Sequence, residues 1–135
     1  MNMIWNVGKG ATSKPQVVMV HYQGDKSRDE VDLALVGKGV TFDTGGLNIK
    51  GTGNMEDMYG DKGGAAAVIG SMIGTSMLGL KKNVVFSVGL AENACGSECF
   101  KPSDILTSMK GLTVHIGNTD AEGRLVMGDV MTYVQ

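Results

Sequence analysis

The sequence contains no apolar run of the roughly 18 residues or more that a membrane-spanning helix needs. Its N-terminal stretch, MNMIWNVGKGATSK, lacks the charged start, apolar middle and small-residue cleavage site of a secretory signal. The formal net charge of −2 at pH 7 provides neither a basic surface that attracts nucleic acid nor an acidic tail. We therefore expect a cytoplasmic protein with no membrane partner and no nucleic-acid partner.

Cysteine and histidine are also scarce, with two residues of each. Cys95 and Cys99 stand in ACGSEC without a second cysteine or histidine pair at zinc-site spacing, so we interpret them as ordinary loop thiols. His21 and His115 lie in alternating apolar runs, where a hydrogen-bonded strand histidine is more common than a metal ligand. Neither histidine is predicted to act as a catalytic base.

What remains has the composition of a soluble globular chain, at 42% hydrophobic and 19% charged residues. A length of 135 residues is within the usual range for one domain, and no repeat or Pro/Ser-rich linker divides it. The 21 glycines indicate tight turns and close packing.

Apolar runs separated by glycine-rich loops predict alternating strands and helices. The expected strands cover 16–22, 33–36, 83–91 and 112–117, and the expected helices cover 63–79 and 124–134. In the first helix, one apolar face is predicted to consist of Ala65, Val68, Ile69, Met72 and Ile73. This order predicts an α/β domain with a mostly parallel sheet flanked by helices.

Polar residues follow two of the predicted strands. Lys38 and Asp43 come after one, in the segment GKGVTFDTGG, which leads into a loop of about 15 residues whose length suggests a functional role. Asp120, Glu122 and Arg124 come after another. Because ligand crevices form beyond the carboxyl ends of strands in open α/β sheets, we expect these two clusters to meet.

The triplet Asp120, Glu122 and Arg124 alternates along the chain, and in an extended segment its side chains would project to one side. Two close carboxylates repel each other unless positive charge lies between them, and a divalent metal supplies more of it than one arginine. Asp43 and Asp61 would bring the number of carboxylates to four. This ligand chemistry suits Mg²⁺, Mn²⁺ or Zn²⁺.

Two other interpretations of these residues compete with a metal site. By itself, DxExR is more typical of a solvated loop with an ion pair. The GKG segment could be a phosphate-binding turn, but the pattern GxxxxGK[ST] is absent, because glycine follows the lysine.

Taken together, VGKGVTFDTGGLNIK, GDKGGAAAV, LAEN and especially NTDAEGRL resemble the leucyl aminopeptidase family. The resemblance covers essentially all of 1–135 but only the central part of that family's C-terminal catalytic domain. It therefore implies a partial two-metal exopeptidase catalytic domain, without the family's N-terminal domain and the last part of its catalytic domain. If other segments normally complete the domain, sheet edges and helix faces should be apolar and exposed.

The resemblance also implies a site with two divalent metal ions, Zn²⁺ or Mn²⁺, with Mg²⁺ or Co²⁺ as alternatives. Its five ligands would be Lys38, Asp43, Asp61, Asp120 and Glu122, with Asp43 and Glu122 bridging the ions. A lysine ligand must be neutral to donate its lone pair, so Lys38 is predicted to be deprotonated.

The catalytic positions implied by the resemblance are Lys50 and Arg124. Lys50 would remain charged, polarise the scissile carbonyl and stabilise the oxyanion. Arg124 would hold a bicarbonate ion that acts as general base. Met58 and Asn118 match positions near the substrate pocket.

The expected function is thus that of a metal-dependent aminopeptidase, a hydrolase that removes leucine and similar residues from peptides with a free N-terminus through metal-activated water. The family forms hexamers, so a homo-oligomer is expected. The alternative is a catalytically inactive metal-binding fragment or structural subunit.

Overall fold

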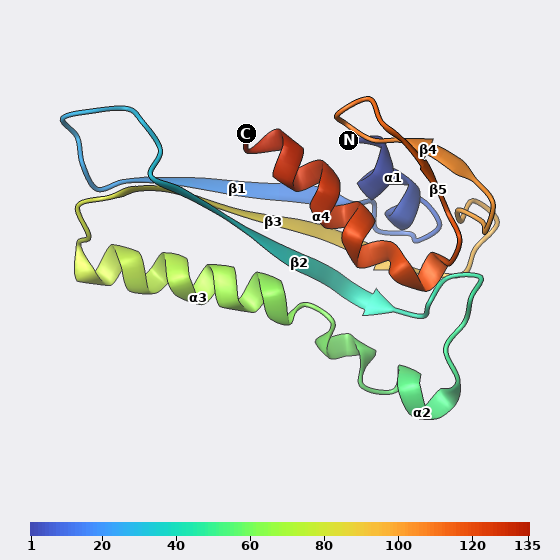
Figure 1. Cartoon of the computed structure of the whole chain (residues 1–135). Coiled ribbons are helices and arrows are strands. Elements are labelled where there is room, and N and C mark those ends of the chain that lie inside the picture. The colour runs from blue at the N-terminus through green and yellow to red at the C-terminus, as the bar shows by residue number, and fades with distance from the viewer.

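A three-stranded sheet forms the centre of the molecule in the computed structural model, which describes residues 1–135 (Figure 1). Its order is β1 (Gln16–Gln23), β3 (Asn83–Asn93) and β2 (Leu33–Asp43). The central strand β3 runs parallel to β2 and antiparallel to β1. The prediction of a mostly parallel sheet is therefore wrong, because the sheet is mixed.

The connections between the strands explain this arrangement. A helical crossover links β2 to β3 and returns the chain to the same end of the sheet, which requires a parallel pair. β1 instead lies on the other side of β3 and runs in the opposite direction. The sequence predicted each of these strands but not their pairing.

Helices cover both faces of the sheet. α3 (Gly63–Leu78) packs against β2 and β3 on one face, and α1 (Asn2–Gly8) and α4 (Glu122–Tyr133) lie on the other (Figure 1). The end of α3 was predicted correctly, since Gly79 caps it with a left-handed φ of 60°. α4 begins two residues earlier than predicted.

The approach of α3 to the sheet depends on a glycine in β2. A Cβ atom at Gly37 would lie 2.7 Å from the carbonyl oxygen of Gly64 and 2.9 Å from the Cα atom of Ala65. Both are backbone atoms at the start of α3, so a side chain at Gly37 would push the helix away from the strand.

β2 is longer than predicted, and this changes the setting of the candidate residues. The expected strand ended at Val36, but the ladder continues through GKGVTFD, with Lys38 opposite Gly89 and Asp43 opposite Asn93. The register shifts between Val40 and Asp43, as in a β-bulge. Lys38 therefore projects from a strand and not from a loop.

Short elements complete the fold: α2 (Thr52–Met55), η1 (Met58–Gly60), β4 (Ile105–Thr107), β5 (Thr113–His115) and η2 (Thr119–Ala121). The strand predicted at 112–117 is confirmed as the shorter β5. It pairs antiparallel with β4, which was not predicted, and these two strands form a separate small sheet.

Two apolar clusters hold the layers together. Between the sheet and α3, Ala65 and Val68 pack with Val84, Phe86 and Val88. The larger cluster, on the other face, consists of Met3, Ile4, Val7, Val40, Ala91, Phe100, Leu106, Ile116, Leu125, Val126 and Val130. Burial of each large apolar side chain contributes about 1.5–3 kcal/mol.

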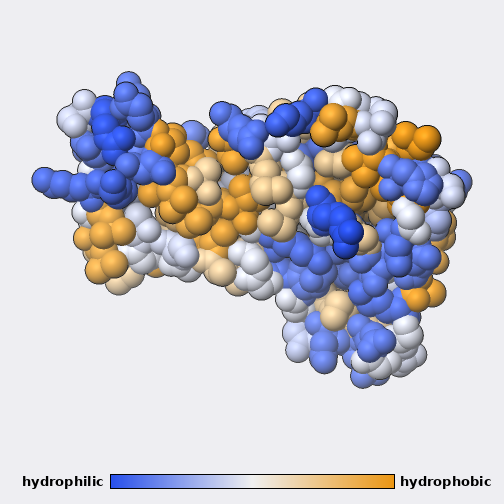
Figure 2. Space-filling view, viewed as in Figure 1, coloured by the Kyte–Doolittle hydropathy of each residue, from blue (hydrophilic) through white to orange (hydrophobic).

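Some apolar surface remains exposed. On α3, the side chains of Ile69 and Ile73 belong to the predicted apolar face but point outward, in line with Met77, which is 82% exposed. On the sheet, Val18 and Leu33 are also exposed. Figure 2 shows hydrophobic surface over the sheet beside α4. No helix combines the length and the apolar character needed to cross a membrane.

Candidate active site

Three carboxylates converge where the end of β2 meets the start of α4. Asp43, Asp120 and Glu122 each present an oxygen within 4.8 Å of the others. Asp43 is the last residue of β2, Asp120 lies in η2, and Glu122 is the first residue of α4. The expected meeting of the two polar clusters therefore occurs for these three residues.

The expected geometry of the Asp120 segment is wrong, however. The segment is not extended, because a 3₁₀ turn leads directly into α4. Arg124 consequently does not share a face with the two carboxylates as residues of a strand would, and it forms no ion pair within 4.0 Å. The structure therefore gathers six of the seven predicted catalytic and metal-binding residues through direct contacts.

Lys50 lies between two of the carboxylates. Its Nζ atom is 3.0 Å from Asp43 Oδ2 and forms a short ion pair with Asp120 Oδ1. Burial lowers the pKa of Lys50, but the hydrogen bonds and charges of Asp120 and Asp43 outweigh it and raise that pKa to about 12. Lys50 therefore remains an ammonium ion at neutral pH.

Lys38 joins the fourth carboxylate to the site. Its Nζ atom donates to Asp61 Oδ1 at 2.9 Å and to Asp61 Oδ2 at 2.7 Å, and it lies 2.7 Å from Glu122 Oε1. Burial lowers the pKa of Lys38, but the hydrogen bonds to Asp61 and Glu122 raise it by more, so the net shift is upward. Among the chain's own groups, Lys38 is thus an ammonium ion.

Glu122 is the most deeply buried carboxylate of the cluster. It is only 1% exposed, neither of its carboxylate oxygens meets the geometry of a hydrogen bond, and its one ion pair joins Oε1 to Lys38 Nζ at 2.7 Å. Burial is the main reason why the pKa of Glu122 is raised, and the nearby charge of Asp43 adds to this shift. A buried carboxylate with a free oxygen beside other carboxylates fits a divalent cation.

The loop after β2 is shaped by two glycines with left-handed backbones. Gly45 has a φ of 87° and Gly46 a φ of 66°. The Gly45 amide donates to Asp43 Oδ1 at 2.9 Å, and the Lys50 amide donates to the Thr44 carbonyl at 2.9 Å. This tight turn places Lys50 beside Asp43, the last residue of β2.

Three polar residues of this region were not predicted from the sequence. Thr119 is fully buried, and its hydroxyl donates to the Gly45 carbonyl at 2.6 Å. Asn48 and Thr119 exchange hydrogen bonds through their backbone amides and side-chain oxygens. Asn93, also fully buried, donates to Asp43. These residues lie within or beside GGLNIK, LAEN and NTDAEGRL, which were the only signal for them.

Two cavities divide the remaining candidates. One of about 530 Å³ is lined by Met58 together with Lys50 and Asp120. Another of about 260 Å³ is lined by Arg124 and Asn118. Asn118 Oδ1 also accepts the Asp120 amide at 2.7 Å, so this side chain caps the turn that carries Asp120.

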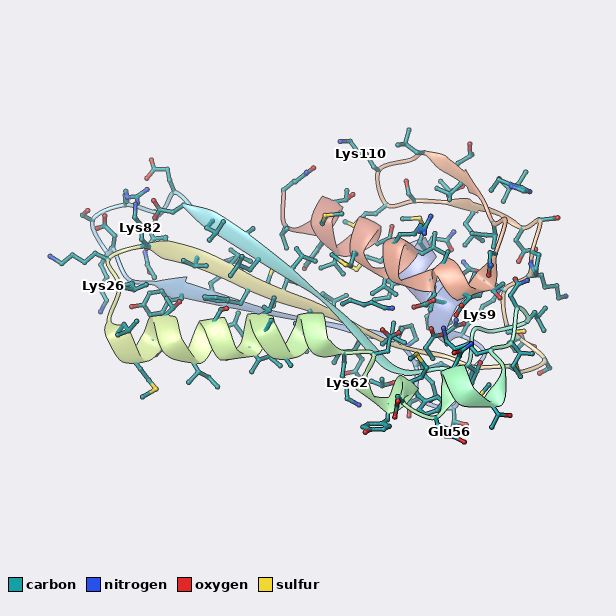
Figure 3. All side chains as sticks on the ribbon, turned by 60° about the horizontal axis from the view of Figure 1, so that its bottom comes forward. Lys9, Lys26, Glu56, Lys62, Lys82 and Lys110 are labelled. Atoms are coloured by element: carbon teal, nitrogen blue, oxygen red, sulfur yellow. The ribbon has the colours of Figure 1, made fainter.

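Two charged residues near the site, Glu56 and Lys62, are exposed. Figure 3 shows Glu56 and Lys62 at the two ends of the segment that joins α2 to α3. Lys62 Nζ donates to the Thr41 carbonyl at 3.2 Å, and Glu56 forms no ion pair. Neither side chain belongs to the carboxylate cluster.

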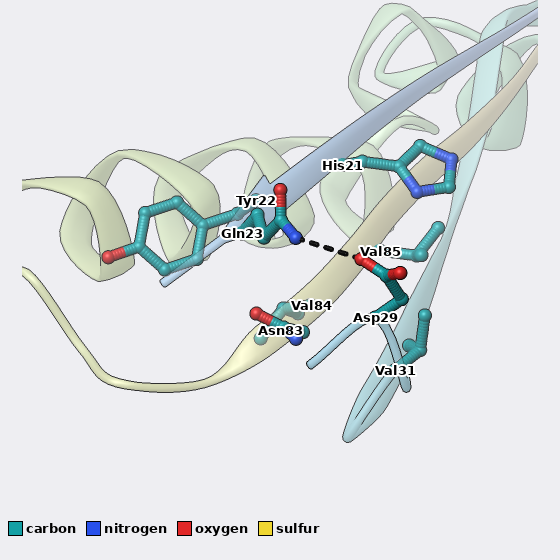
Figure 4. A pocket seen from close by; sticks show the side chains of 8 residues that line it. All are labelled: His21, Tyr22, Gln23, Asp29, Val31, Asn83, Val84 and Val85. Atoms are coloured by element: carbon teal, nitrogen blue, oxygen red, sulfur yellow. Dashed lines mark hydrogen bonds between the residues drawn. The ribbon is translucent and has the colours of Figure 1, made fainter. Parts of the chain in front are cut away.

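A further cavity, of about 220 Å³, lies toward the opposite end of β3 (Figure 4). His21, Val31 and Asn83 contribute to its lining, and Gln23 Nε2 donates to Asp29 Oδ1 at 3.3 Å. It contains one carboxylate and no group of metal-binding side chains. The candidate chemistry is therefore concentrated at the Asp43 end of the sheet.

Comparison with known proteins supports the family resemblance over the whole chain. The model for the catalytic domain of the cytosol aminopeptidase family matches residues 1–135. The cytosol aminopeptidase of Dictyostelium discoideum is 44% identical over 133 residues, which cover 98% of this chain and 26% of that protein. The chain thus spans about a quarter of the length of the curated relatives it matches.

Solved structures agree with the sequence matches. The cytosol aminopeptidase from Coxiella burnetii superposes with a TM-score of 0.93 at 35% identity, over 98% of this chain and 28% of that one. The bottromycin maturation enzyme BotP, solved in complex with Mn, superposes with a TM-score of 0.87 at 36% identity, over 98% of this chain and 28% of that one.

Proposed function

Because the chain belongs to the cytosol aminopeptidase family, we propose that it forms the core of the active site of a metal-dependent aminopeptidase. The observation that carries the proposal is the convergence of Asp43, Asp120 and Glu122, with two lysines bound to them. The reaction is hydrolysis of the first peptide bond of a peptide with a free N-terminus, with leucine and similar side chains as substrates.

The proposed ligands of two divalent ions are Lys38, Asp43, Asp61, Asp120 and Glu122. Four carboxylates face the Lys38 and Lys50 ammonium ions, and this excess of negative charge favours cations. Lys38 would have to release its proton to act as a ligand, because only the neutral amine has a lone pair to donate, and a bound dication would favour that release. When bound, such ions supply Lewis-acid chemistry, which polarises a carbonyl and lowers the pKa of water. Mn²⁺ is the first probe to choose, because the related BotP was solved with Mn; Zn²⁺, Mg²⁺ and Co²⁺ are the alternatives.

The chain's own groups have distinct tasks in this proposal. Lys50, with its raised pKa, provides a fixed positive charge for the substrate carbonyl and its developing oxyanion. Arg124, which has no carboxylate partner, is available to hold an anion such as bicarbonate as the general base. Met58 lines the cavity beside Lys50 and would contact the substrate side chain. Asn118 is the second proposed substrate contact.

Cytoplasmic location and assembly into a homo-oligomer, a hexamer in the complete family members, accompany this proposal. The names of the relatives, cytosol aminopeptidases, support the location. The assembly rests on the resemblance alone.

A second candidate function is metal binding without catalysis. The observation that favours it is that Arg124 lines a different cavity from Lys50. A site that holds ions but cannot align an anion and a substrate would bind metal without turnover.

The two candidates separate in one experiment on the full chain. Mn²⁺ is titrated into the protein by calorimetry, and hydrolysis of leucine amide is then followed with bound Mn²⁺. Binding with release of leucine is expected. Binding without release would favour the second candidate, and no binding would contradict both. Glu56→Gln, a change to a carboxylate outside the cluster, serves as the control and should behave as wild type.

A further inference from the structure

Asn93 is the last residue of β3 and is fully buried beside Asp43. We infer that Asn93 is a positioning residue that fixes which oxygen of Asp43 is presented to a cation. This inference rests on the proposed metal centre and adds a residue to it that ligand chemistry alone does not identify.

The contacts of Asn93 join the two segments that build the site. Its Nδ2 atom donates to Asp43 Oδ1 at 2.8 Å and to the Thr119 carbonyl at 3.1 Å. Its backbone carbonyl accepts the Thr44 amide at 2.9 Å and the Thr44 hydroxyl at 2.7 Å. One side chain therefore links the end of β2 to the turn before α4.

These contacts make the two oxygens of Asp43 unequal. Oδ1 accepts hydrogen bonds from Asn93 and from the Gly45 amide, whereas Oδ2 faces the Lys50 ammonium ion at 3.0 Å. Oδ2 is thus the oxygen directed at positive charge. Partners of this kind behind a ligand hold its orientation and tune its affinity for the metal.

The orientation of the Asn93 amide is fixed by its neighbours. The two groups that face its NH₂ group, the Asp43 carboxylate and the Thr119 carbonyl, can only accept hydrogen bonds. A flipped amide would place its oxygen against two acceptors, so the NH₂ group must face them.

The Asn93 side-chain oxygen, on the other side, has no hydrogen-bond partner although it is buried. A Cβ atom at Gly46 would lie 2.9 Å from this oxygen, so the glycine keeps its space open. An unpaired buried oxygen destabilises the fold and calls for an explanation. The explanation is that Asp43 and the Thr119 carbonyl both need a donor here, and an amide that supplies two donated hydrogen bonds brings an oxygen with it.

A matched residue at the other end of β3 separates positioning from ordinary structure. Asn83 is also buried, and its Nδ2 atom donates to the carbonyls of Arg28 at 3.0 Å and Glu30 at 3.1 Å. Its Oδ1 atom accepts the Asp25 amide at 3.0 Å. Asn83 thus ties down a loop through a fully paired amide and contacts none of the proposed ligands.

The test compares two Asn93 variants with Asn83→Ala. Asn93→Leu keeps the branched shape of the side chain but donates no hydrogen bond, and Asn93→Ala removes the amide altogether. Calorimetric titration gives the Mn²⁺ affinity, electron paramagnetic resonance reports the surroundings of bound Mn²⁺, and thermal melting gives stability. Both Asn93 variants should bind Mn²⁺ about 10- to 100-fold more weakly and alter its spectrum. Asn83→Ala should lower the melting temperature and leave both Mn²⁺ readouts unchanged.

Unchanged Mn²⁺ affinity and spectrum in either folded Asn93 variant would overturn the inference. So would an equal loss of affinity in Asn83→Ala, since that would mean general destabilisation. Failure of the wild-type chain to bind Mn²⁺ would instead overturn the proposed function, and the inference with it.

Discussion

The side chain of Lys38 lies directly over Gly123 in the first turn of α4. A Cβ atom at Gly123 would come 2.7 Å from Lys38 Cε and 3.0 Å from Lys38 Nζ. A methyl group at residue 123 would therefore displace the end of the Lys38 side chain, which contacts Glu122 and Asp61 together. This relationship gives the glycine of NTDAEGRL a role in positioning a proposed ligand.

Gly123→Ala should therefore weaken Mn²⁺ binding by about 10-fold, in the range found for other partners of metal ligands. Helix propensity alone would make this change stabilising, by up to about 1 kcal/mol. Gly70→Ala is the matched control, because Gly70 lies within α3 and an added methyl group there would have no other atom within 4 Å. Titration and melting of both variants measure the two effects. A Gly123→Ala chain with wild-type affinity would contradict the assigned role.

The proposed division between metal ligands and catalytic residues predicts two different kinds of loss. Asp120→Asn and Glu122→Gln remove charge at the point where Asp43, Asp120 and Glu122 converge, so Mn²⁺ binding should be lost. Lys50→Ala should keep the metal and lower leucine-amide turnover by about 10²–10³, as for loss of one oxyanion donor. Calorimetry and single-turnover kinetics on the same preparations distinguish these outcomes. Loss of Mn²⁺ from Lys50→Ala would show that the roles are divided wrongly.

Sequence patterns predicted those parts of the fold in which the spacing of apolar residues along the chain follows directly from how the element is buried. β3 is buried on both faces and reads as a nearly continuous apolar run, NVVFSVGLA. The limits of α3 follow from its glycines. Its faces do not, because Ile69 and Ile73 are exposed although they share the apolar pattern with Ala65 and Val68.

The parts that were missed depend on contacts between distant segments. The extension of β2 was hidden because glycine and lysine in GKGVTFD are weak strand formers, and the ladder with β3 overrides that preference. The site carboxylates were found from their residue types and the family resemblance. Asn93 was not, since a buried amide has no spacing rule and its role appears only when β3 is placed beside Asp43.

Asp129 is a buried carboxylate that the proposed site does not use. Its Oδ2 atom accepts the amides of Met3 at 2.8 Å and Ile4 at 3.3 Å, and its Oδ1 atom accepts the amide of Met109 at 2.8 Å. Asp129→Ala would leave these backbone donors unpaired in the interior, so we expect a loss of about 2–4 kcal/mol in the free energy of unfolding.

Urea unfolding of Asp129→Ala measures this loss, and Mn²⁺ affinity of the folded fraction should stay at the wild-type value. Thr107→Ala, a change in the neighbouring strand β4, is a control for general effects of substitution in this region. A loss below about 0.5 kcal/mol, the usual size for a neutral surface change, would show that the three amides find other partners.

Asp32, just before β2, is expected to make the stability of the fold depend on pH in the acid range. Its carboxylate accepts Arg28 Nη2 at 2.6 Å, the Asn83 amide at 2.8 Å and Lys82 Nζ at 3.1 Å, and the pKa of Asp32 is lowered chiefly by the Arg28 hydrogen bond. A lowered folded-state pKa stabilises the fold above the unfolded value of about 3.9, and the contribution is lost as pH falls below it. Asp32→Asn should therefore be less stable than wild type near pH 7, and the gap should narrow toward about pH 3 in urea unfolding. Glu56→Gln, which breaks no ion pair, should show no such narrowing. A gap between Asp32→Asn and wild type that stays constant with pH would mean that ionisation of Asp32 does not contribute to stability.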